Sequence, residues 1–184
     1  ANIYCLILSK FLSFDVVVRS NSAPSGWSNN FLKNLTFKFF FKFAKSIIVN
    51  SKEFKKELDK RFNVNSNMIY NPLNLNQIKR KSYSKINFKI FKKKNSIKFI
   101  NVARFTDQKD HMTLLKAFKK LNHIINYELL IMGYGVNYFK IKNYIIKNGL
   151  NKNINIIKFQ KNPYKFINKS NVLILSSTFE GLPN

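Results

Sequence analysis

Apolar and polar residues alternate along the chain in blocks that predict strands separated by helices. In the first third, short apolar runs at 15–20, 46–51 and 67–72 have the length and composition of strands. A Phe-rich helix that ends near Lys45 lies between the first two runs. The helix KEFKKELDKRF follows the second, with Ser51 as its expected N-cap. This order of strand, helix, strand, helix and strand predicts a parallel sheet covered by helices.

The pattern is interrupted over residues 73–95, which lack apolar periodicity and are dense in charge. Domain boundaries fall in polar segments of this kind, so we interpret 73–95 as an interdomain linker. The chain would then consist of one domain part over 1–72 and another over 96–184.

The alternation resumes after the predicted linker. We expect strands at 96–104, 128–133, 154–159 and 172–177, and helices at 110–122, 136–149 and, beginning at Pro163, up to 170. The four strands are almost uniformly apolar, as parallel strands buried on both faces are. The sequence therefore predicts an α/β protein that contains the end of one doubly wound domain and the beginning of a second.

Length and composition agree with parts of two domains. The chain has 184 residues and is 45% hydrophobic. It begins with Ala1 and has no predicted helix after the last strand, so we expect an internal fragment of a longer protein. Cys5 is the single cysteine, which excludes an intramolecular disulfide and a cysteine-based metal site and fits a reducing compartment.

The net charge of +25 would suit a polyanionic partner such as RNA, DNA or an anionic membrane. A second explanation is codon bias, because Lys, Asn, Ile and Phe are abundant together and all have A/T-rich codons. The sequence has no RNP-type, helix-turn-helix or zinc-finger pattern, so we do not expect nucleic acid as the partner. A non-catalytic basic module that binds RNA or an anionic membrane surface is the competing hypothesis.

One segment, residues 31–49, is apolar enough to suggest a membrane helix. It contains four lysines, which argue against a spanning helix: Lys33, Lys38, Lys42 and Lys45. An amphipathic helix with Phe37 and Phe41 on its apolar side is the better interpretation, and we expect that side to pack in the core. A peripheral contact with anionic lipid is the alternative.

Candidate chemistry lies after the strands, because ligands of open parallel sheets bind outside the carboxyl ends of the strands. Arg104 and Lys109 end the strand 96–104 and precede a helix, so they could hold a phosphate group together with the helix amides. Both could instead be ordinary surface residues of a basic chain. Glu180 follows the last strand, where its carboxylate could accept hydrogen bonds from two sugar hydroxyls or complement a helix dipole.

Other motifs carry weaker signals. Gly133-Tyr134-Gly135 allows either a tight turn or a close approach to a ligand, but Tyr138 occupies the place of the third glycine in a dinucleotide fingerprint. We therefore expect no NAD site. His111 and His123 have no partner set for a metal, and we expect structural or surface roles for both.

Four stretches, taken in order, resemble the retaining GT-B glycosyltransferases of family 4. They are IIVNSKEFKKEL…MIYNPLN, NVARFTDQKDHMTLLKAF, LLIMGYG and IIKFQKNPYKFINKSNVLILSSTFEGLPN. The resemblance implies two Rossmann-like domains with parallel sheets. Residues 1–72 would be the C-terminal part of the acceptor-side domain. Residues 73–95 would be the linker, and 96–184 the N-terminal part of the nucleotide-sugar-binding domain.

The resemblance also assigns roles to single residues. Arg104 and Lys109 match the basic pair that grips the donor diphosphate, and Glu180 matches the first acid of an E-x7-E motif near the donor sugar. Further donor-binding residues would be Gly133, Gly135, Phe159, Gln160, Lys161, Asn162, Gly181 and Leu182. The second acid of the motif would fall at position 188, beyond this chain, so we expect the segment alone to be inactive.

The implied activity is transfer of a hexosyl or N-acetylhexosaminyl group from a nucleotide-sugar to a glycan or lipid-linked acceptor with retention of configuration. A UDP-sugar is the favoured donor. No metal or other cofactor is expected, because the basic pair would neutralise the leaving diphosphate. Cell-envelope polysaccharide biosynthesis is the expected pathway, and the expected location is the cytoplasm, with a peripheral position at the inner face of the plasma membrane as an option.

Overall fold

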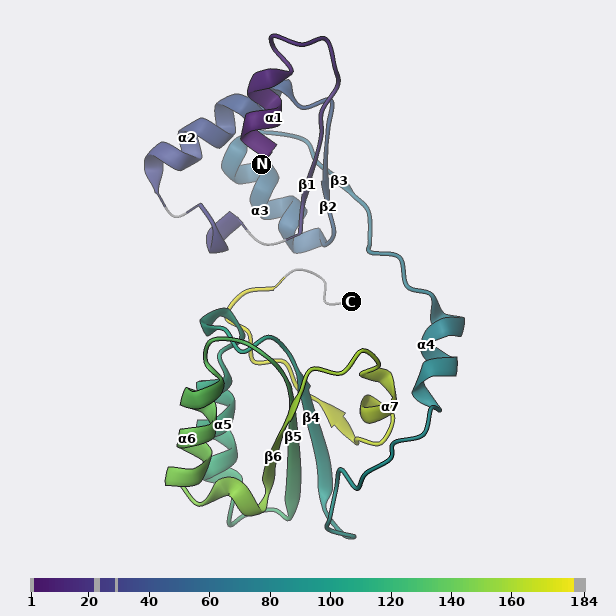
Figure 1. Ribbon diagram of the computed structural model, residues 1–184. Helices are drawn as coiled ribbons and strands as arrows, with labels where there is room; N and C mark the ends of the chain where they lie inside the picture. Colours follow the sequence, from purple (N-terminus) through teal and green to yellow (C-terminus); the bar gives the residue numbers. More distant parts are fainter. Residues whose placement is uncertain (1, 22–23, 29, 181–184) are drawn as a thin grey trace. The chain divides into compact units, whose positions relative to one another are not determined.

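The structure is a computed structural model that describes residues 2–21, 24–28 and 30–180 (Figure 1). The chain divides into two compact units. The first contains the residues up to Leu73 and those from Phe179 onward, and the second runs from Asn74 to Thr178.

The first unit is a parallel sheet with helices. Its elements are α1 (Asn2–Leu8), β1 (Val17–Ser20), the 3-10 turn Pro24–Gly26, α2 (Phe31–Phe40), the 3-10 turn Phe41–Phe43, β2 (Ser46–Val49), α3 (Lys52–Phe62) and β3 (Asn67–Met68). The strands lie in the order β1-β2-β3, and Val17 pairs with Ser46. The predicted alternation of strands and helices is confirmed for this unit.

The Phe-rich helix packs against the core of the first unit through Phe37 and Phe40, which are partly buried, and the predicted full burial is reached only in the 3-10 turn that follows it. Phe41 is buried, and its ring centroid lies 5.3 Å from that of Phe62, which is fully buried. Phe37 contacts Trp27 edge to face at 4.6 Å. Among the described residues, no helix combines the length and the hydropathy needed to cross a bilayer.

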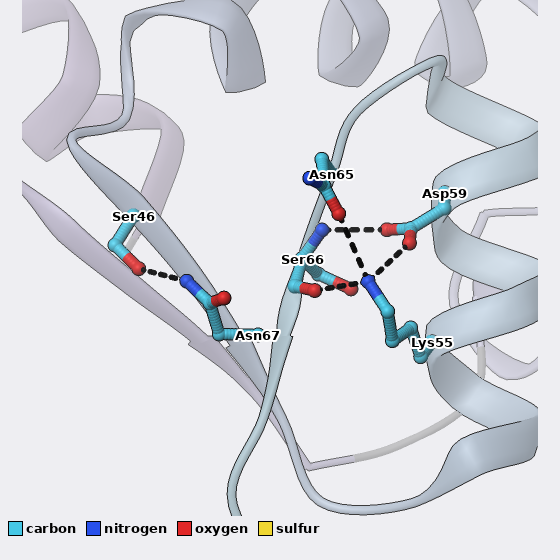
Figure 2. Close-up of polar contacts among 6 residues, drawn as sticks. All are labelled: Ser46, Lys55, Asp59, Asn65, Ser66 and Asn67. Carbon is cyan, nitrogen blue, oxygen red and sulfur yellow. Dashed lines mark hydrogen bonds and ion pairs between the residues drawn. The ribbon is translucent and has the colours of Figure 1, made fainter.

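Helix α3 begins where the sequence predicts, because the Ser51 hydroxyl accepts a hydrogen bond from the Phe54 amide at 3.1 Å. A polar cluster joins this helix to the chain before β3 (Figure 2). The ammonium group of Lys55 contacts Asp59 at 2.8 Å, and Asp59 accepts a hydrogen bond from the Ser66 amide at 2.8 Å. Burial alone would raise the pKa of Asp59, but the hydrogen bonds from Lys55 and Ser66 lower the pKa below its usual value.

The second unit is a larger parallel sheet with helices on both faces. Its elements are α4 (Leu75–Ser82), β4 (Ile97–Val102), the 3-10 turn Asp107–Lys109, α5 (His111–Leu121), β5 (Tyr127–Gly133), α6 (Tyr138–Lys147), the 3-10 turn Leu150–Lys152, β6 (Ile154–Lys158), α7 (Tyr164–Ile167) and β7 (Val172–Leu173). The strand order is β6-β5-β4-β7, and all pairs are parallel. Figure 1 shows α5 and α6 on one face of this sheet, with α4 and α7 on the other.

The core of the second unit lies around β5, whose seven residues are all buried. Its buried residues alternate between the two faces. Leu129 and Ile131 pack with the residues of α5 and α6, whereas Leu130 and Met132 pack with Phe166 of α7. A strand that faces helices on both sides is apolar along most of its length, as the sequence predicts, and Glu128 near the start of β5 is the charged exception.

Several elements differ from the sequence-based expectation. In the first unit, α1 was not expected, and β3 has two residues where a strand over 67–72 was predicted. Helix α4 lies within the predicted linker 73–95 and packs against α7 in the second unit. The last strand was expected to be buried over 172–177, but β7 has only two residues, and Val172 and Leu173 are 40% and 48% exposed. Among the described strands, β7 pairs only with β4, so its other edge is unpaired, although its apolar composition predicts a buried strand.

Candidate functional site

The carboxyl ends of β4 and β7 lie side by side at the point where the strand order reverses. In open parallel sheets this switch point is where ligands bind. The Asn101 side-chain amide donates to the Ile174 carbonyl at 2.9 Å, and the Ile174 amide donates to the Ile100 carbonyl at 2.8 Å. These bonds hold the ends of the two strands together, so the loops that follow them emerge from one place.

Arg104 lies in a loop whose backbone is held by hydrogen bonds of the next residue, Phe105. The side chain of Arg104 is exposed, whereas Phe105 next to it is fully buried. The Phe105 amide donates to the Tyr134 carbonyl at 2.7 Å, and the Phe105 carbonyl accepts from the Asn137 amide at 3.0 Å. The guanidinium group is therefore carried by an ordered backbone.

The turn Gly133-Tyr134-Gly135 allows the loop that carries Arg104 to approach the end of β5 closely. A Cβ atom on Gly133 would lie 1.9 Å from the carbonyl oxygen of Ala103. Gly135 has a φ of +147°, and a Cβ atom there would lie 2.5 Å from the Phe105 carbonyl oxygen. Both glycines thus serve the approach of two loops of the same unit, which favours the tight-turn interpretation. Their contact with a donor stays a prediction.

Lys109 lies at the end of the 3-10 turn in the same loop, and the segment after β7 is bonded to this turn. The Ser176 hydroxyl donates to the Lys109 carbonyl at 2.8 Å, and the Thr178 amide donates to the Gln108 carbonyl at 2.9 Å. Glu180 is grouped with the first unit, so its place beside Arg104 and Lys109 stays a prediction. The predicted residues Gly181 and Leu182 lie outside the described residues.

The start of α5 is already capped by a carboxylate. Asp110 adopts a left-handed conformation with φ 38°, and its side chain accepts a hydrogen bond from the Thr113 amide at 3.1 Å. Hydrogen bonds from the Thr113 side chain and from its amide lower the pKa of Asp110, which stays ionised at neutral pH. The sequence analysis expected free helix amides to assist anion binding. Because Asp110 occupies the helix end, Arg104 and Lys109 have to supply the positive charge.

His111 adds no charge to this loop. Its side chain is 3% exposed and packs edge to face against Phe105, with ring centroids 5.1 Å apart. Burial lowers the pKa of His111 to about 4, so the imidazole is neutral at pH 7. The expected structural role is confirmed for His111, and His123 is exposed on the surface.

An exposed aromatic pair lies at the carboxyl ends of β5 and β6. Phe159 and Tyr134 are 58% and 59% exposed, and their rings meet at nearly right angles with centroids 5.8 Å apart. Such a pair offers a surface on which a planar base could pack. Tyr134 was not predicted as a binding residue. Its position between two glycines at the end of a strand could have indicated an exposed aromatic ring at the ligand edge.

The other predicted donor-binding residues after β6 lie in different surroundings. The Gln160 side chain donates to the Lys158 carbonyl at 3.4 Å, and the Lys161 side chain is exposed. The Asn162 side-chain amide donates to the Lys81 carbonyl at 2.9 Å, so this residue holds the end of α4.

The first unit has a pocket of its own at the carboxyl end of β1, with a volume of about 430 Å³. Arg19 and Ser20 from β1 line it together with Trp27, Phe37 and residues of α1. The Arg19 guanidinium donates a hydrogen bond to the Asn71 side chain. No sequence motif indicates this pocket, because its lining comes from segments that are far apart in the chain.

Comparison with known proteins decides the family. Residues 82–184 match the family described as glycosyl transferases group 1. The chain belongs to this family. The match begins at the end of α4 and spans the candidate site at the carboxyl edge of the second unit.

Relatives with this family's activity in their names cover nearly the whole chain. An uncharacterized glycosyltransferase of Methanocaldococcus jannaschii is 34% identical over 96% of this chain and 45% of its own length. The N-acetylgalactosamine-N,N'-diacetylbacillosaminyl-diphospho-undecaprenol 4-alpha-N-acetylgalactosaminyltransferase of Campylobacter jejuni is 27% identical over 85% of this chain and 41% of its own. The chain thus spans less than half the length of the curated relatives it matches.

Solved structures of glycosyltransferases have the same fold. Anabaena Alr3699/HepE in complex with UDP matches with a TM-score of 0.73 at 14% identity, over 96% of this chain and 50% of that one. The lipopolysaccharide outer core galactosyltransferase WaaB matches with a TM-score of 0.66 at 18% identity, over 98% of this chain and 48% of that one. The predicted GT-B fold class, with parts of two Rossmann-like domains, is confirmed.

Proposed function

We propose that the whole protein is a retaining glycosyltransferase of family 4 that moves a hexosyl or N-acetylhexosaminyl group from a UDP-sugar to a glycan or lipid-linked acceptor. Membership of the glycosyl transferases group 1 family supports sugar transfer. The names of two relatives support the acceptor class. One acts on a diphospho-undecaprenol-linked sugar, and the other is a capsular polysaccharide biosynthesis glycosyltransferase of Staphylococcus aureus, 34% identical over 62% of this chain.

The two units have separate roles in this proposal. The second unit binds the nucleotide-sugar, because it contains the loops at the carboxyl edge where a parallel sheet binds its ligand. The first unit belongs to the acceptor side. Its pocket at the end of β1 combines the guanidinium of Arg19 with the aromatic rings of Trp27 and Phe37, a lining that suits a sugar ring.

The observation that carries the proposal is the position of Arg104 and Lys109 in one braced loop at the switch point. Negative charge on the departing diphosphate rises as the glycosidic bond breaks, so cations fixed beside it bind the transition state more tightly than the ground state. Preorganised charge of this kind accounts for much of the rate enhancement of many enzymes. The ordered backbone of Phe105 provides the preorganisation. The pair would do the work that a metal does elsewhere, so we propose a metal-independent reaction.

The remaining groups would bind other parts of the donor. Glu180 would accept hydrogen bonds from sugar hydroxyls, because a carboxylate has acceptor capacity for two neighbouring donors. Gly181 and Leu182 would contribute backbone amides beside it. Tyr134 and Phe159 would flank the base, since aromatic rings pack well against planar groups.

The test is the turnover of Arg104→Ala in the full-length protein with a UDP-sugar and a lipid-linked acceptor. We expect turnover to fall on the order of 10²–10³-fold, as for the loss of other charge-stabilising donors. Arg80→Ala, which removes an exposed arginine from α4, is the matched control and should keep normal turnover. Near-normal turnover in Arg104→Ala would contradict the proposed role, and abolition of wild-type activity by EDTA would contradict metal independence.

A further inference from the structure

A basic hollow lies at the amino-terminal edge of the sheet in the second unit, away from the candidate donor site. Its volume is about 540 Å³, and the chain between α4 and β4 forms most of its lining. Lys98 near the start of β4 and Lys169 before β7 complete the lining. Because β4 is six residues long, about 20 Å of strand separates this edge from the loop that carries Arg104.

The charge around the hollow has one sign. Lys85, Lys89, Lys98 and Lys169 line it, and its lining includes no acidic residue. Residues 74–98 contain nine Lys or Arg and no Asp or Glu. Within the described part of the chain, none of the four lining ammonium groups has an ion-pair or hydrogen-bond partner. Four cations gathered without a counter-charge repel one another, and an anionic partner would relieve that repulsion.

The backbone that carries these lysines is fixed to the rest of the unit. Glu128 of β5 is 8% exposed and accepts hydrogen bonds from the amides of Lys92 and Lys93, both at 2.7 Å. Asn162 donates to the Lys81 carbonyl at 2.9 Å, and Ile90 is buried in the core. The lysines are therefore arranged on an ordered surface, unlike those of a flexible basic tail.

Exposed aromatic residues accompany the lysines. Tyr83 and Phe88 also line the hollow and are 72% and 50% exposed. The ring of Phe88 is anchored against the buried Phe166, with centroids 6.0 Å apart. Aromatic rings beside lysines suit the interfacial region of a bilayer, where rings lie at headgroup depth and ammonium groups meet lipid phosphates.

We propose that this hollow binds phosphate-bearing headgroups of anionic lipids and docks the second unit on a membrane surface. Lys and Arg residues near a membrane surface are attracted to anionic lipid headgroups, and clusters of four to eight of them mark lipid-binding segments. The four lining lysines reach the lower end of that range.

The test compares two quadruple variants of the full-length protein in a vesicle sedimentation assay. The first replaces the lining lysines with Gln at positions 85, 89, 98 and 169. The control removes the same charge from α5, α6 and the following turn, where Lys120, Lys142, Lys147 and Lys152 are exposed. Vesicles of phosphatidylcholine with one-third phosphatidylglycerol are compared with vesicles of phosphatidylcholine alone.

We expect wild-type protein to bind only the anionic vesicles. Each lysine near an anionic surface contributes about fivefold to partitioning, so the lining variant, which loses four lysines, should lose on the order of 500-fold. The control variant should lose less than about tenfold, because its charges lie on another face and are screened. Equal losses in the two variants, or equal binding to neutral vesicles, would overturn the proposal.

Two further measurements distinguish other outcomes. Tighter binding of wild-type protein to a single-stranded oligoribonucleotide than to vesicles, lost in the lining variant, would assign the hollow to RNA and overturn the lipid proposal. UDP titration should give the wild-type affinity in both variants, since their substitutions lie away from the carboxyl edge. Failure of the proposed sugar transfer would appear as a wild-type protein that does not bind UDP but keeps the vesicle pattern.

Discussion

At the scale of single residues, the loop after β4 contains an exposed charged side chain, Arg104, and leads to a buried neutral one, His111. Arg104 is exposed and carries its charge to the carboxyl edge of the sheet. His111 is buried against Phe105 and stays neutral, because desolvation lowers its pKa to about 4. The histidine therefore supports the loop by packing.

This burial predicts a dependence of stability on pH. In the unfolded chain His111 takes up a proton near pH 6.5, whereas in the folded protein it does so only near pH 4. Stability is therefore fully present above pH 6.5 and falls as the pH drops toward 4. The expected loss between pH 7 and pH 4.5 is about 2–3 kcal/mol, measured by urea unfolding followed by circular dichroism.

Two histidine variants test whether His111 causes this loss of stability. His111→Phe should abolish most of the pH dependence in this window, whatever its stability at pH 7. His123→Gln removes the exposed histidine and should leave the dependence unchanged. An unaltered pH dependence in His111→Phe would show that another group titrates.

At the scale of elements, the loops after β4 and β5 pack directly against each other, because Gly133 and Gly135 have no Cβ atom that would collide with the neighbouring backbone. The sequence suggested a tight turn at Gly133 and Gly135. It did not indicate that the backbone of the loop after β4 lies against these two glycines. That approach depends on the register of β4 and β5, in which Val102 pairs with Met132. Register comes from tertiary packing, which local sequence does not encode.

Substitution of Gly133 tests this coupling. A methyl group on Gly133 would meet the Ala103 carbonyl at 1.9 Å, so one of the two loops has to move. We expect Gly133→Ala to lower the free energy of unfolding by about 3 kcal/mol, at the upper end of overpacking effects, and to weaken UDP binding. Gly149→Ala is the control, since it has φ +65° but open space around it. It should cost about 1–2 kcal/mol and leave UDP binding intact. A larger loss in the control would contradict the coupling.

Elements with strong local signals could be predicted, and those that depend on distant partners could not. Helix α3 has an N-cap at Ser51 and apolar residues at helical spacing, and its predicted bounds match the structure. Helix α4 has only two apolar residues, Leu75 and Ile78, and none of its residues is buried. It is stabilised by the Asn74 cap and by Asn162, which lies about eighty residues away in the sequence. In the same way, the apolar composition of β7 did not indicate that it would have one described neighbour.

At the scale of the whole molecule, two parallel-sheet units agree with the GT-B fold, and the family match lies on the second unit. The sequence alone placed Arg104 and Lys109 after the same strand, because residues that follow one strand have to share its edge. It could not provide Tyr134 beside Phe159 or the hollow around Lys98, because both are assembled from separate segments. The central proposal is that the edge with Arg104 and Lys109 binds the diphosphate of a nucleotide-sugar.

The most direct test is calorimetric titration of the full-length protein with UDP and with uridine. The two ligands differ only in the diphosphate, so their affinity difference reports the contacts to that group. We expect UDP to bind at least about 100-fold more tightly than uridine, because hydrogen bonds to charged groups contribute about 1.5–3 kcal/mol each. The double variant Arg104→Ala, Lys109→Ala should bind both ligands with similar affinity. A double variant that keeps the wild-type preference for UDP would contradict the assignment of the diphosphate to this edge.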